Sequence, residues 1–464
     1  MSEQLQGGQL TTADVTASTV ANIGPGIDFY FGFGVIAVTA GVGAPLTILA
    51  AALAVLLLAL SVAEFTRDEP SAGSFIEFVE SGLGPAAGVA TAFLVVVGYA
   101  IAIAGVFTMS GGFVAATLTR YGHVTIPWGP LTVAITLGAL ALMITGIRLS
   151  TSVVAGAVVF QVVVMVVACI VILVDHRGQL SAAPFSWSHV SDGLTGLSAG
   201  FPLALYMFIG WENGPALAEE CKDPRRTVPR ALLISIGIAT VLFLLFAYAT
   251  VTGFDYDLSS VGRSSIPFLT VADQALGPLA VTAWVAGVVS VLATLVSGAN
   301  SQSRMVYDGG RTGKLPSWLG TVHPGTGTPV RALTALVGAG LAVIGVWALA
   351  HLAGGDTGSM NPVGLYAECS TFGTIIILFV YVLAMVSLPL YVHRRHRERF
   401  SVVRHLAVPL TGAAALAVPF VSLCAPGQPA PYDVFPYAAL LLALAAGAGG
   451  VAVIRRRPPE VVSP

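Results

Sequence analysis

Charged residues are scarce in this chain, because Asp, Glu, Lys and Arg together make up only 9% of its 464 residues. A soluble protein carries roughly a quarter charged residues, so this composition excludes a solvated globular surface. Hydrophobic residues make up 56%, and the mean hydropathy is +0.86. No hydrophilic stretch is long enough to form a separate soluble domain. The composition therefore indicates a protein that is embedded in a membrane.

Cysteine is also rare, and its four copies are isolated, which argues against a metal cluster or a disulfide framework. The chain contains no glycine-rich phosphate loop with a lysine, and its eight histidines fall in loops or at the ends of apolar runs. We therefore expect no enzyme activity, no cofactor and no metal site. Residues 1–14 lack the basic region and short apolar core of a cleaved signal peptide. The net charge of −2 points to no particular partner, and nucleic acid is not expected.

Long apolar runs are abundant instead. Runs near or above the roughly 20 residues that cross a bilayer as a helix recur along the whole chain. Twelve of them can be delimited, so we expect an all-α, multi-pass fold with twelve transmembrane helices. They cover residues 17–40, 45–64, 85–118, 129–147, 151–174, 194–218, 229–252, 279–306, 329–352, 363–391, 403–423 and 433–454.

The basic residues predict the orientation of these spans. With both chain ends in the cytoplasm, 18 of the 21 Lys and Arg residues fall on the cytoplasmic side, and only Arg120, Arg177 and Arg263 fall outside. Such a bias in short loops sets the orientation of membrane proteins. We expect a protein of the cell membrane with cytoplasmic tails at residues 1–14 and 455–464. The dominance of Arg over Lys, with much Ala, Gly and Val, hints at a bacterial genome.

Two short sequences recur at corresponding places in the two halves of the chain. Gly82-Leu83-Gly84-Pro85 precedes the third span, and Ala275-Leu276-Gly277-Pro278 precedes the eighth. Because each half then holds five spans, an odd number, the second copy must enter the membrane from the opposite side, as an inverted repeat. The expected units are residues 15–176 and 190–400, followed by two helices in 401–454. The alternative explanation is that proline is common in the first turn of any helix, so that its recurrence here does not indicate a repeat.

The first span is interrupted at Gly24-Pro25-Gly26, directly after Ile23. Proline cannot close its own helical hydrogen bond, so nearby backbone groups become available to a ligand, and a half-helix that begins here directs its positive end at an anion. A packing kink is the other interpretation. An acid in mid-membrane, such as Asp28, costs about 2.5–3.5 kcal/mol and normally faces a cavity or a partner. Asp28 is either a counter-charge for a substrate amine or coupling cation, or a buried structural carboxylate.

The sixth span is interrupted around Gly210, next to a second acid, Glu212. A pair of interrupted spans, one in each half, is the best pointer from sequence to the binding site of a secondary transporter. Aromatic residues here can cover a substrate or hold a cation, although they can also simply pack. Glu212 is our candidate for proton coupling or gating. The candidate substrate contacts in and near this break are Tyr206, Phe208, Ile209, Gly210 and Trp211.

Other polar residues lie at plausible depth in the apolar runs. Tyr99 in the third span is a further candidate contact, and Gln161 in the fifth a candidate for coupling, although both types of residue also join helices by hydrogen bonds. Glu368 in the tenth span is expected near its outer end. Three loops of mixed charge, at residues 64–75, 218–231 and 303–316, fall on the cytoplasmic side. They are either solvated or paired in a gate.

These features together resemble the amino acid–polyamine–organocation (APC) superfamily of permeases. The resemblance covers residues from about 15 to 320 and rests on a set of motifs in the family's order. The motifs are the break at Gly24, Glu64 with Pro70-Ser71-Ala72-Gly73, Phe208 to Glu212 running into Ala218-Glu219-Glu220, Pro224-Arg225-Arg226 with Pro229-Arg230-Ala231, and Arg304 to Pro316.

The resemblance implies a five-plus-five inverted repeat with discontinuous helices 1 and 6, and two additional C-terminal helices. It implies a substrate between spans 1, 3, 6, 8 and 10, moved by alternating access. In the family the first break binds a carboxylate through amides, and the second receives the amine through carbonyls. The resemblance places a gating aromatic at Tyr206 and a proton-linked or gating acid at Glu212.

Three departures from the family pattern affect the expected substrate. Pro25 removes an amide donor, Gln161 occupies the place of a lysine and cannot titrate, and Asp28 is not typical of the family. We expect a secondary transporter of amino acids or related amines, linked to protons or working by exchange, with a polyamine or cationic amine permease as the alternative. An intramembrane enzyme or a transporter-derived sensor is a distant alternative. The expected partners are a small-molecule substrate and the lipid bilayer, with the protein as a monomer or homodimer.

Overall fold

The structure is a computed structural model. It describes residues 10–71, 73–144, 151–257, 259, 261, 264, 266–354, 360–425, 428 and 430–456. Ala72, Arg148, Arg263 and Arg457, and most of the two predicted tails, lie outside these residues.

The described residues form helices joined by turns and loops, with one isolated backbone bridge between Leu10 and Cys221. Short 3₁₀ and π turns occur between and at the ends of the helices. The α-helices are α1 (Thr12–Ile23), α2 (Pro25–Ala40), α3 (Ala44–Asp68), α4 (Phe75–Leu83), α5 (Pro85–Gly122), α6 (Trp128–Ile144), α7 (Thr151–Asp175), α8 (Leu194–Tyr206), α9 (Asn213–Ala216), α10 (Pro224–Gly253), α11 (Pro267–Leu276), α12 (Ala280–Arg311), α13 (Val330–Ala353), α14 (Pro362–Arg395), α15 (Val408–Leu423) and α16 (Phe435–Arg456).

Eight stretches of the described residues are long and apolar enough to cross a membrane. Two of them are composite, since Thr12–Asp68 contains α1 to α3 and Pro267–Arg311 contains α11 and α12. Three further apolar helices are shorter, at Trp128–Ile144, Leu194–Tyr206 and Val403–Val418. A multi-pass helical fold is therefore confirmed, while the count of twelve spans and the inverted repeat stay predictions.

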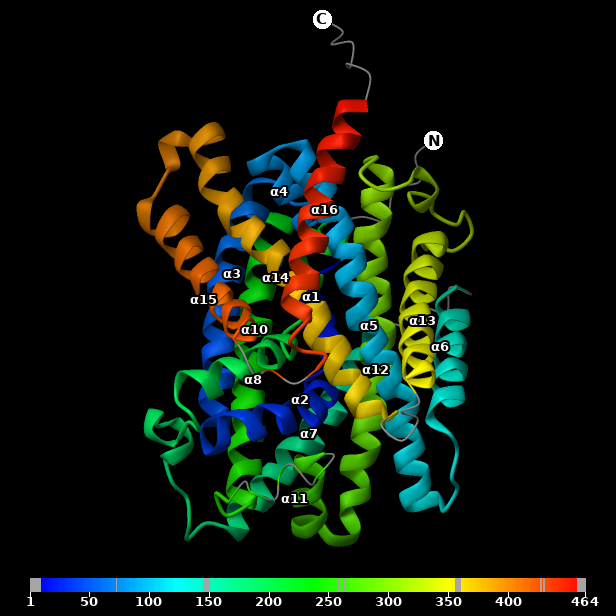
Figure 1. Ribbon diagram of the computed structural model, residues 1–464, viewed down its shortest axis with the longest axis vertical. Coiled ribbons are helices and arrows are strands. Elements are labelled where there is room, and N and C mark those ends of the chain that lie inside the picture. Colours follow the sequence, from blue (N-terminus) through cyan, green and yellow to red (C-terminus); the bar gives the residue numbers. More distant parts are fainter. Residues whose placement is uncertain are drawn as a thin grey trace, which may run out of the picture.

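Proline and glycine mark the element boundaries that the two recurring sequences predicted. The short helix α4 ends before Gly84, which has φ +94°, and Pro85 then begins the long helix α5. In the second half, α11 ends before Gly277, with φ +55°, and Pro278 follows in a 3₁₀ turn that leads into α12. Figure 1 shows α4 at the end of the molecule where both chain ends lie, and α11 at the other end.

Helix α5 runs through the middle of the bundle, where it packs against α14, α12, α16 and α6. Its glycines allow close approach, because a Cβ on Gly98 would lie 2.9 Å from the Ile377 side chain of α14. Helices at the periphery instead expose large apolar side chains, such as Val346 and Leu349 on α13. Such side chains suit contact with lipid rather than water.

Candidate functional site

The first break is a single residue. Gly24, between α1 and α2, has a left-handed conformation with φ +62°, which suits glycine, and a side chain there would collide with Thr294. Pro25 occupies the first position of α2 and has no N–H. The Ile27 N–H donates to Ser290 Oγ at 2.9 Å, whereas the Gly26 N–H makes no hydrogen bond among the described residues. One backbone donor at the N-terminus of α2 is therefore available.

The second break is longer and lies against the first. Helix α8 ends at Tyr206 and α9 begins at Asn213, with only turns between them. Gly210 has φ +110°, and a Cβ there would lie 2.7 Å from backbone atoms of Asn22. The Asn22 side chain donates from Nδ2 to the Gly210 carbonyl at 3.1 Å. The two interrupted helices thus meet at their breaks.

A cavity of about 30 Å³ lies where the breaks meet. A water molecule needs about 10–15 Å³ of such space, so this cavity has room for about two or three waters and is too small for an amino acid. The lining comes from α1, α2, α5, α8, the second break and α12. The lining residues are Asn22, Asp28, Ala102, Ile103, Val106, Tyr206, Ile209, Gly210, Thr294, Gly298 and Gln302.

Asp28 is the acid that lines this cavity. Its side chain is buried, and its one hydrogen bond among the described residues is long, with the Tyr366 hydroxyl donating to Oδ1 at 3.5 Å. The Tyr366 ring packs edge-on against the Tyr206 ring, with centroids 5.6 Å apart. The Tyr206 hydroxyl donates to the Ala102 carbonyl at 3.4 Å. Asp28 thus faces the cavity among aromatic rings, with no cation paired to it in the described structure.

Glu212 has a different environment. It is buried outside the cavity lining, and both of its carboxylate oxygens accept hydrogen bonds. The Tyr99 hydroxyl donates to one oxygen, and the Gly210 N–H donates to the other at 2.9 Å. Tyr99 therefore holds Glu212 rather than lining the cavity, and Glu212 in turn fixes the backbone of the second break.

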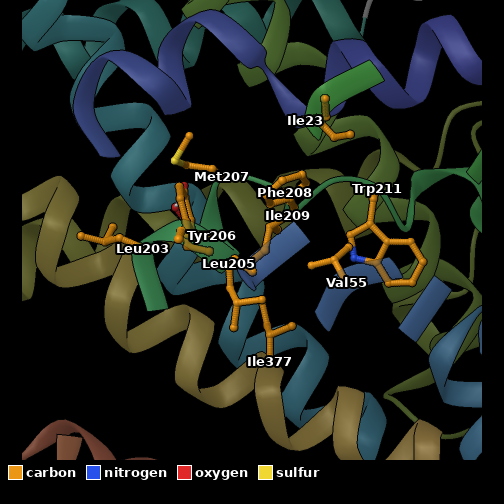
Figure 2. Packing of buried hydrophobic residues seen from close by; sticks show 14 of the residues in the cluster. Ile23, Val55, Leu203, Leu205, Tyr206, Met207, Phe208, Ile209, Trp211 and Ile377 are labelled. Atoms are coloured by element: carbon orange, nitrogen blue, oxygen red, sulfur yellow. Dashed lines mark hydrogen bonds between the residues drawn. The ribbon is translucent and has the colours of Figure 1, made fainter. Parts of the chain in front are cut away.

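Of the remaining candidates, Tyr206, Ile209 and Gly210 line the cavity, whereas the others lie around the breaks without lining it. Figure 2 shows Tyr206 and Trp211 on opposite sides of Ile209. Trp211 packs against the rings of Phe75 and Tyr381, and Phe208 packs against Phe243, while Ile23, Pro25 and Gly26 are buried at the first break.

The side chain of Gln161, on α7, lies next to Gly26 of the first break. Its Oε1 lies 2.8 Å from the place of a Cβ on Gly26, and neither polar atom of its side chain has a partner among the described residues. The other residues that line the cavity were not predicted from the sequence, and they are Asn22, three apolar residues of α5, and Thr294, Gly298 and Gln302. The last three are spaced by four residues and therefore share one face of α12, which is a signal that the sequence contains.

Aromatic side chains close the cavity toward the end of the molecule where α11 lies. Phe113 of α5 stacks on Trp284 of α12 with centroids 5.4 Å apart, and it also contacts Tyr30 of α2 at 5.9 Å. Nearer that end, Arg120 pairs with Asp273 at 2.6 Å. The closure therefore depends mainly on apolar packing.

Ion pairs close the other end, where the chain termini lie. Lys314 is nearly buried and bonds to Glu77 and Glu80 of α4 at 2.5 and 2.6 Å. Burial alone would lower the pKa of Lys314, but the two carboxylates outweigh this and raise it. Arg311 pairs with Glu219, and Arg304 with Glu220, at 2.9 and 2.8 Å. The arginine pairs join two of the predicted loops of mixed charge, at residues 303–316 and 218–231, and Lys314 joins residues 303–316 to α4, which follows the loop at residues 64–75.

The comparisons with known proteins agree with this architecture. The model of the amino acid permease family matches residues 8–445. The chain belongs to this family. The predicted resemblance to the APC superfamily is thereby confirmed, and the chain is a multi-pass membrane permease.

Curated relatives of the permease differ in what their names say they carry. It is 26% identical to the branched-chain amino acid permease BcaP of Bacillus subtilis, over 67% of this chain and 68% of the relative. It is 25% identical to the methylthioribose transporter of the same organism, over 70% of this chain and 74% of the relative. It is also 25% identical to the chloroplastic cationic amino acid transporter 7 of Arabidopsis thaliana, over 70% and 59%.

Solved structures share the fold of the permease. Crystal structures of two mutants of the Eremococcus coleocola manganese transporter match with TM-scores of 0.59 and 0.60. They cover 96% and 97% of this chain, and 95% and 98% of the transporter, at 12% identity. At this identity the likeness concerns the fold alone. Within the described part of the permease, no three His, Cys, Asp or Glu side chains lie together as a metal site would need.

Proposed function

We propose that the permease is a secondary transporter of amino acids or related amines that works by alternating access across the cell membrane. The observation that carries this proposal is the small cavity, lined by buried residues, at the meeting point of two interrupted helices. Irregular backbone is tolerated at membrane depth where it is buried in protein or lines a cavity, and in transporters it binds the substrate. No covalent step and no cofactor enter the mechanism.

The substrate's ends have different partners in this proposal. The carboxylate binds at the N-terminus of α2, where the Gly26 N–H and the positive end of the helix attract an anion. The amine binds toward the second break, at Tyr206 to Gly210. Asn22, Thr294 and Gln302 supply neutral polar groups on the facing wall.

Alternating access follows from the two closures. Both are shut around a cavity too small for an amino acid, so the permease is in an occluded form. In the proposed cycle the aromatic closure opens to the outside and the ion-pair closure opens to the cytoplasm, one at a time. The positions of α4 and α11 at opposite ends support an inverted repeat of residues 15–176 and 190–400 (Figure 1).

We propose that transport is coupled to protons, with Glu212 as the acid that carries the proton, or that the permease instead exchanges one substrate for another. The contacts of Glu212 support this role, because its carboxylate fixes the backbone at Gly210, which contacts the first break. A change in the charge of Glu212 would therefore alter the backbone conformation of the second break and its contact with the first break. Gln161, which cannot titrate, places an uncharged side chain next to Gly26.

Ligand-induced stabilisation of the purified permease tests this function. A ligand at 100 times its dissociation constant adds about 2.7 kcal/mol to the free energy of unfolding. We expect a rise in melting temperature with one or more α-amino acids, and a smaller one with the amines that their decarboxylation gives. Gly298→Val should abolish the response, because its side chain enters a cavity whose nearest atom to a Cβ is Asn22 Oδ1 at 3.3 Å.

Gly338→Val is the matched control, because Gly338 is exposed on α13 with nothing within 4 Å of a Cβ. It should keep the ligand response and should also keep uptake of the stabilising ligand into proteoliposomes. If no amino acid or amine is bound or taken up by the unmodified permease, the proposed function is wrong. Full uptake by Gly298→Val would instead show that the substrate does not pass through this cavity.

A further inference from the structure

The cavity has two chemically different walls. Asn22, Thr294 and Gln302 present amide and hydroxyl groups, whereas Asp28 presents a carboxylate. No Lys, Arg or His is among the lining residues. A charged carboxylate in a dry interior is costly unless it is paired, and no basic side chain of this cavity lining pairs with Asp28. A cationic ligand would supply that partner.

The surroundings of Asp28 are suited to an organic cation. Tyr206 and Tyr366 place their rings beside it, and Phe31 packs on Tyr366 with centroids 5.7 Å apart. Aromatic faces next to a carboxylate bind ammonium and guanidinium groups by cation–π attraction. The single long hydrogen bond from Tyr366 leaves most of the carboxylate's acceptor capacity unused among the described residues.

The position of Asp28 along α2 indicates which group of the substrate it meets. Asp28 lies two residues after Gly26, a rise of about 3 Å along the helix, and the Gly26 N–H is the proposed contact of the substrate carboxylate. The proposed function places the α-amino group at the second break, at Tyr206 to Gly210, so the α-amino group is not the cation that pairs with Asp28. A cation in the side chain reaches Asp28 while the carboxylate stays at the N-terminus of α2.

We propose that Asp28 and Tyr206, which line the cavity, form a subsite for a cationic side chain and that Tyr366 positions both of them, so that the permease selects amino acids with a basic side chain. This inference rests on the proposed transport function and names the substrate class of the same cavity. Glu212 is not an alternative for this role, because its two oxygens already accept hydrogen bonds and it does not line the cavity.

Three probes of similar shape test the inference by thermal shift and by uptake into proteoliposomes. Lysine has both the carboxylate and the distal cation, norleucine has an uncharged side chain in its place, and cadaverine lacks the carboxylate. We expect the unmodified permease to bind lysine at least tenfold more tightly than norleucine. This comparison needs no variant and is therefore independent of any folding defect.

Asp28→Asn keeps the shape of the side chain and removes its charge. It should weaken lysine binding at least tenfold and leave norleucine binding unchanged or stronger. Glu368→Gln is the control, because Glu368 is another acid of the helical bundle that does not line the cavity and bonds to Trp347 Nε1 at 2.7 Å. It should leave the preference for lysine intact.

The outcomes separate this inference from the proposed function. Equal binding of lysine and norleucine, or an equal loss of both in Asp28→Asn, would overturn the cation subsite while leaving amino acid transport in place. Binding of cadaverine as tight as that of lysine would support the subsite and overturn the carboxylate contact. Absence of binding and uptake with every probe and every other amino acid would refute the transport function itself.

Discussion

The break between α1 and α2 consists of Gly24 alone, whereas the break between α8 and α9 extends from Met207 to Glu212. The short break keeps two half-helices almost continuous and frees few backbone groups. The long break frees more of them, and two side chains satisfy the Gly210 peptide, since Glu212 accepts its N–H and Asn22 donates to its carbonyl. Unpaired backbone groups at this depth would cost several kcal/mol each.

Because of this difference, we expect the two breaks to have different functions. The short break presents one helix N-terminus and one amide, which is a compact site for an anion. The long break depends on Glu212 and Asn22 for its conformation, so its shape can respond to a change at either residue. Substitutions at Gly210, Glu212 and Pro25 test this contrast.

Gly210→Ala should disrupt the long break most severely. The residue has φ +110°, a conformation that costs about 1–3 kcal/mol for a residue with a side chain. The new Cβ would also press against Asn22 backbone atoms at 2.7 Å, so the two breaks would have to separate. We expect a large fall in melting temperature in detergent and loss of the monodisperse protein.

Gly237→Ala is the control for this substitution. Gly237 is exposed within α10 and has open space around a Cβ, so alanine should slightly stabilise the helix. A Gly210→Ala variant that melts and transports like the unmodified permease would contradict the close contact between the breaks.

Glu212→Gln should have the next largest effect. The carboxylate accepts from the Tyr99 hydroxyl and from the Gly210 N–H, and glutamine offers only one acceptor oxygen in its place. If Glu212 carries the coupled proton, the variant should lose pH-dependent accumulation of substrate and keep part of its exchange activity. Proteoliposomes with and without a pH gradient distinguish the two activities.

Glu368→Gln again provides the comparison, because it neutralises an acid away from the cavity. An unchanged dependence on the pH gradient in Glu212→Gln would remove Glu212 from the coupling mechanism. In that case its role would be confined to holding the Gly210 backbone.

The positions of both breaks could be predicted because glycine and proline act locally. Glycine adopts positive φ without strain, as Gly24 and Gly210 do here. Pro25 has no N–H to donate, whatever its surroundings. The acids could be predicted as unusual because charge in an apolar run is costly. Sequence alone could not tell that Asp28 lines the cavity and Glu212 does not, because this depends on how each segment is rotated in the bundle.

Contacts between residues that are far apart along the chain also could not be predicted from the sequence. The bond from Asn22 to Gly210 crosses between the two halves of the chain, and Lys314 reaches Glu77 from a loop far along it. The three loops of mixed charge were recognisable, but their pairing was not. Thr294, Gly298 and Gln302 resemble ordinary interhelical contacts until the packing shows that they face a cavity.

Pro25→Ala should have the smallest effect and should strengthen the short break as an anion site. Alanine restores the N–H that proline lacks, which adds one donor at the N-terminus of α2. A hydrogen bond to a charged group contributes about 1.5–3 kcal/mol at best, and competition with water reduces this, so we expect severalfold tighter binding of amino acids. Pro85→Ala, the same change at the first residue of α5 away from the cavity, should leave affinity unchanged. Because decarboxylated amines have no group to accept the new N–H, their affinity should not rise. A parallel gain for amino acids and amines would mean that the substrate carboxylate binds elsewhere, and that the short break is a kink rather than an anion site.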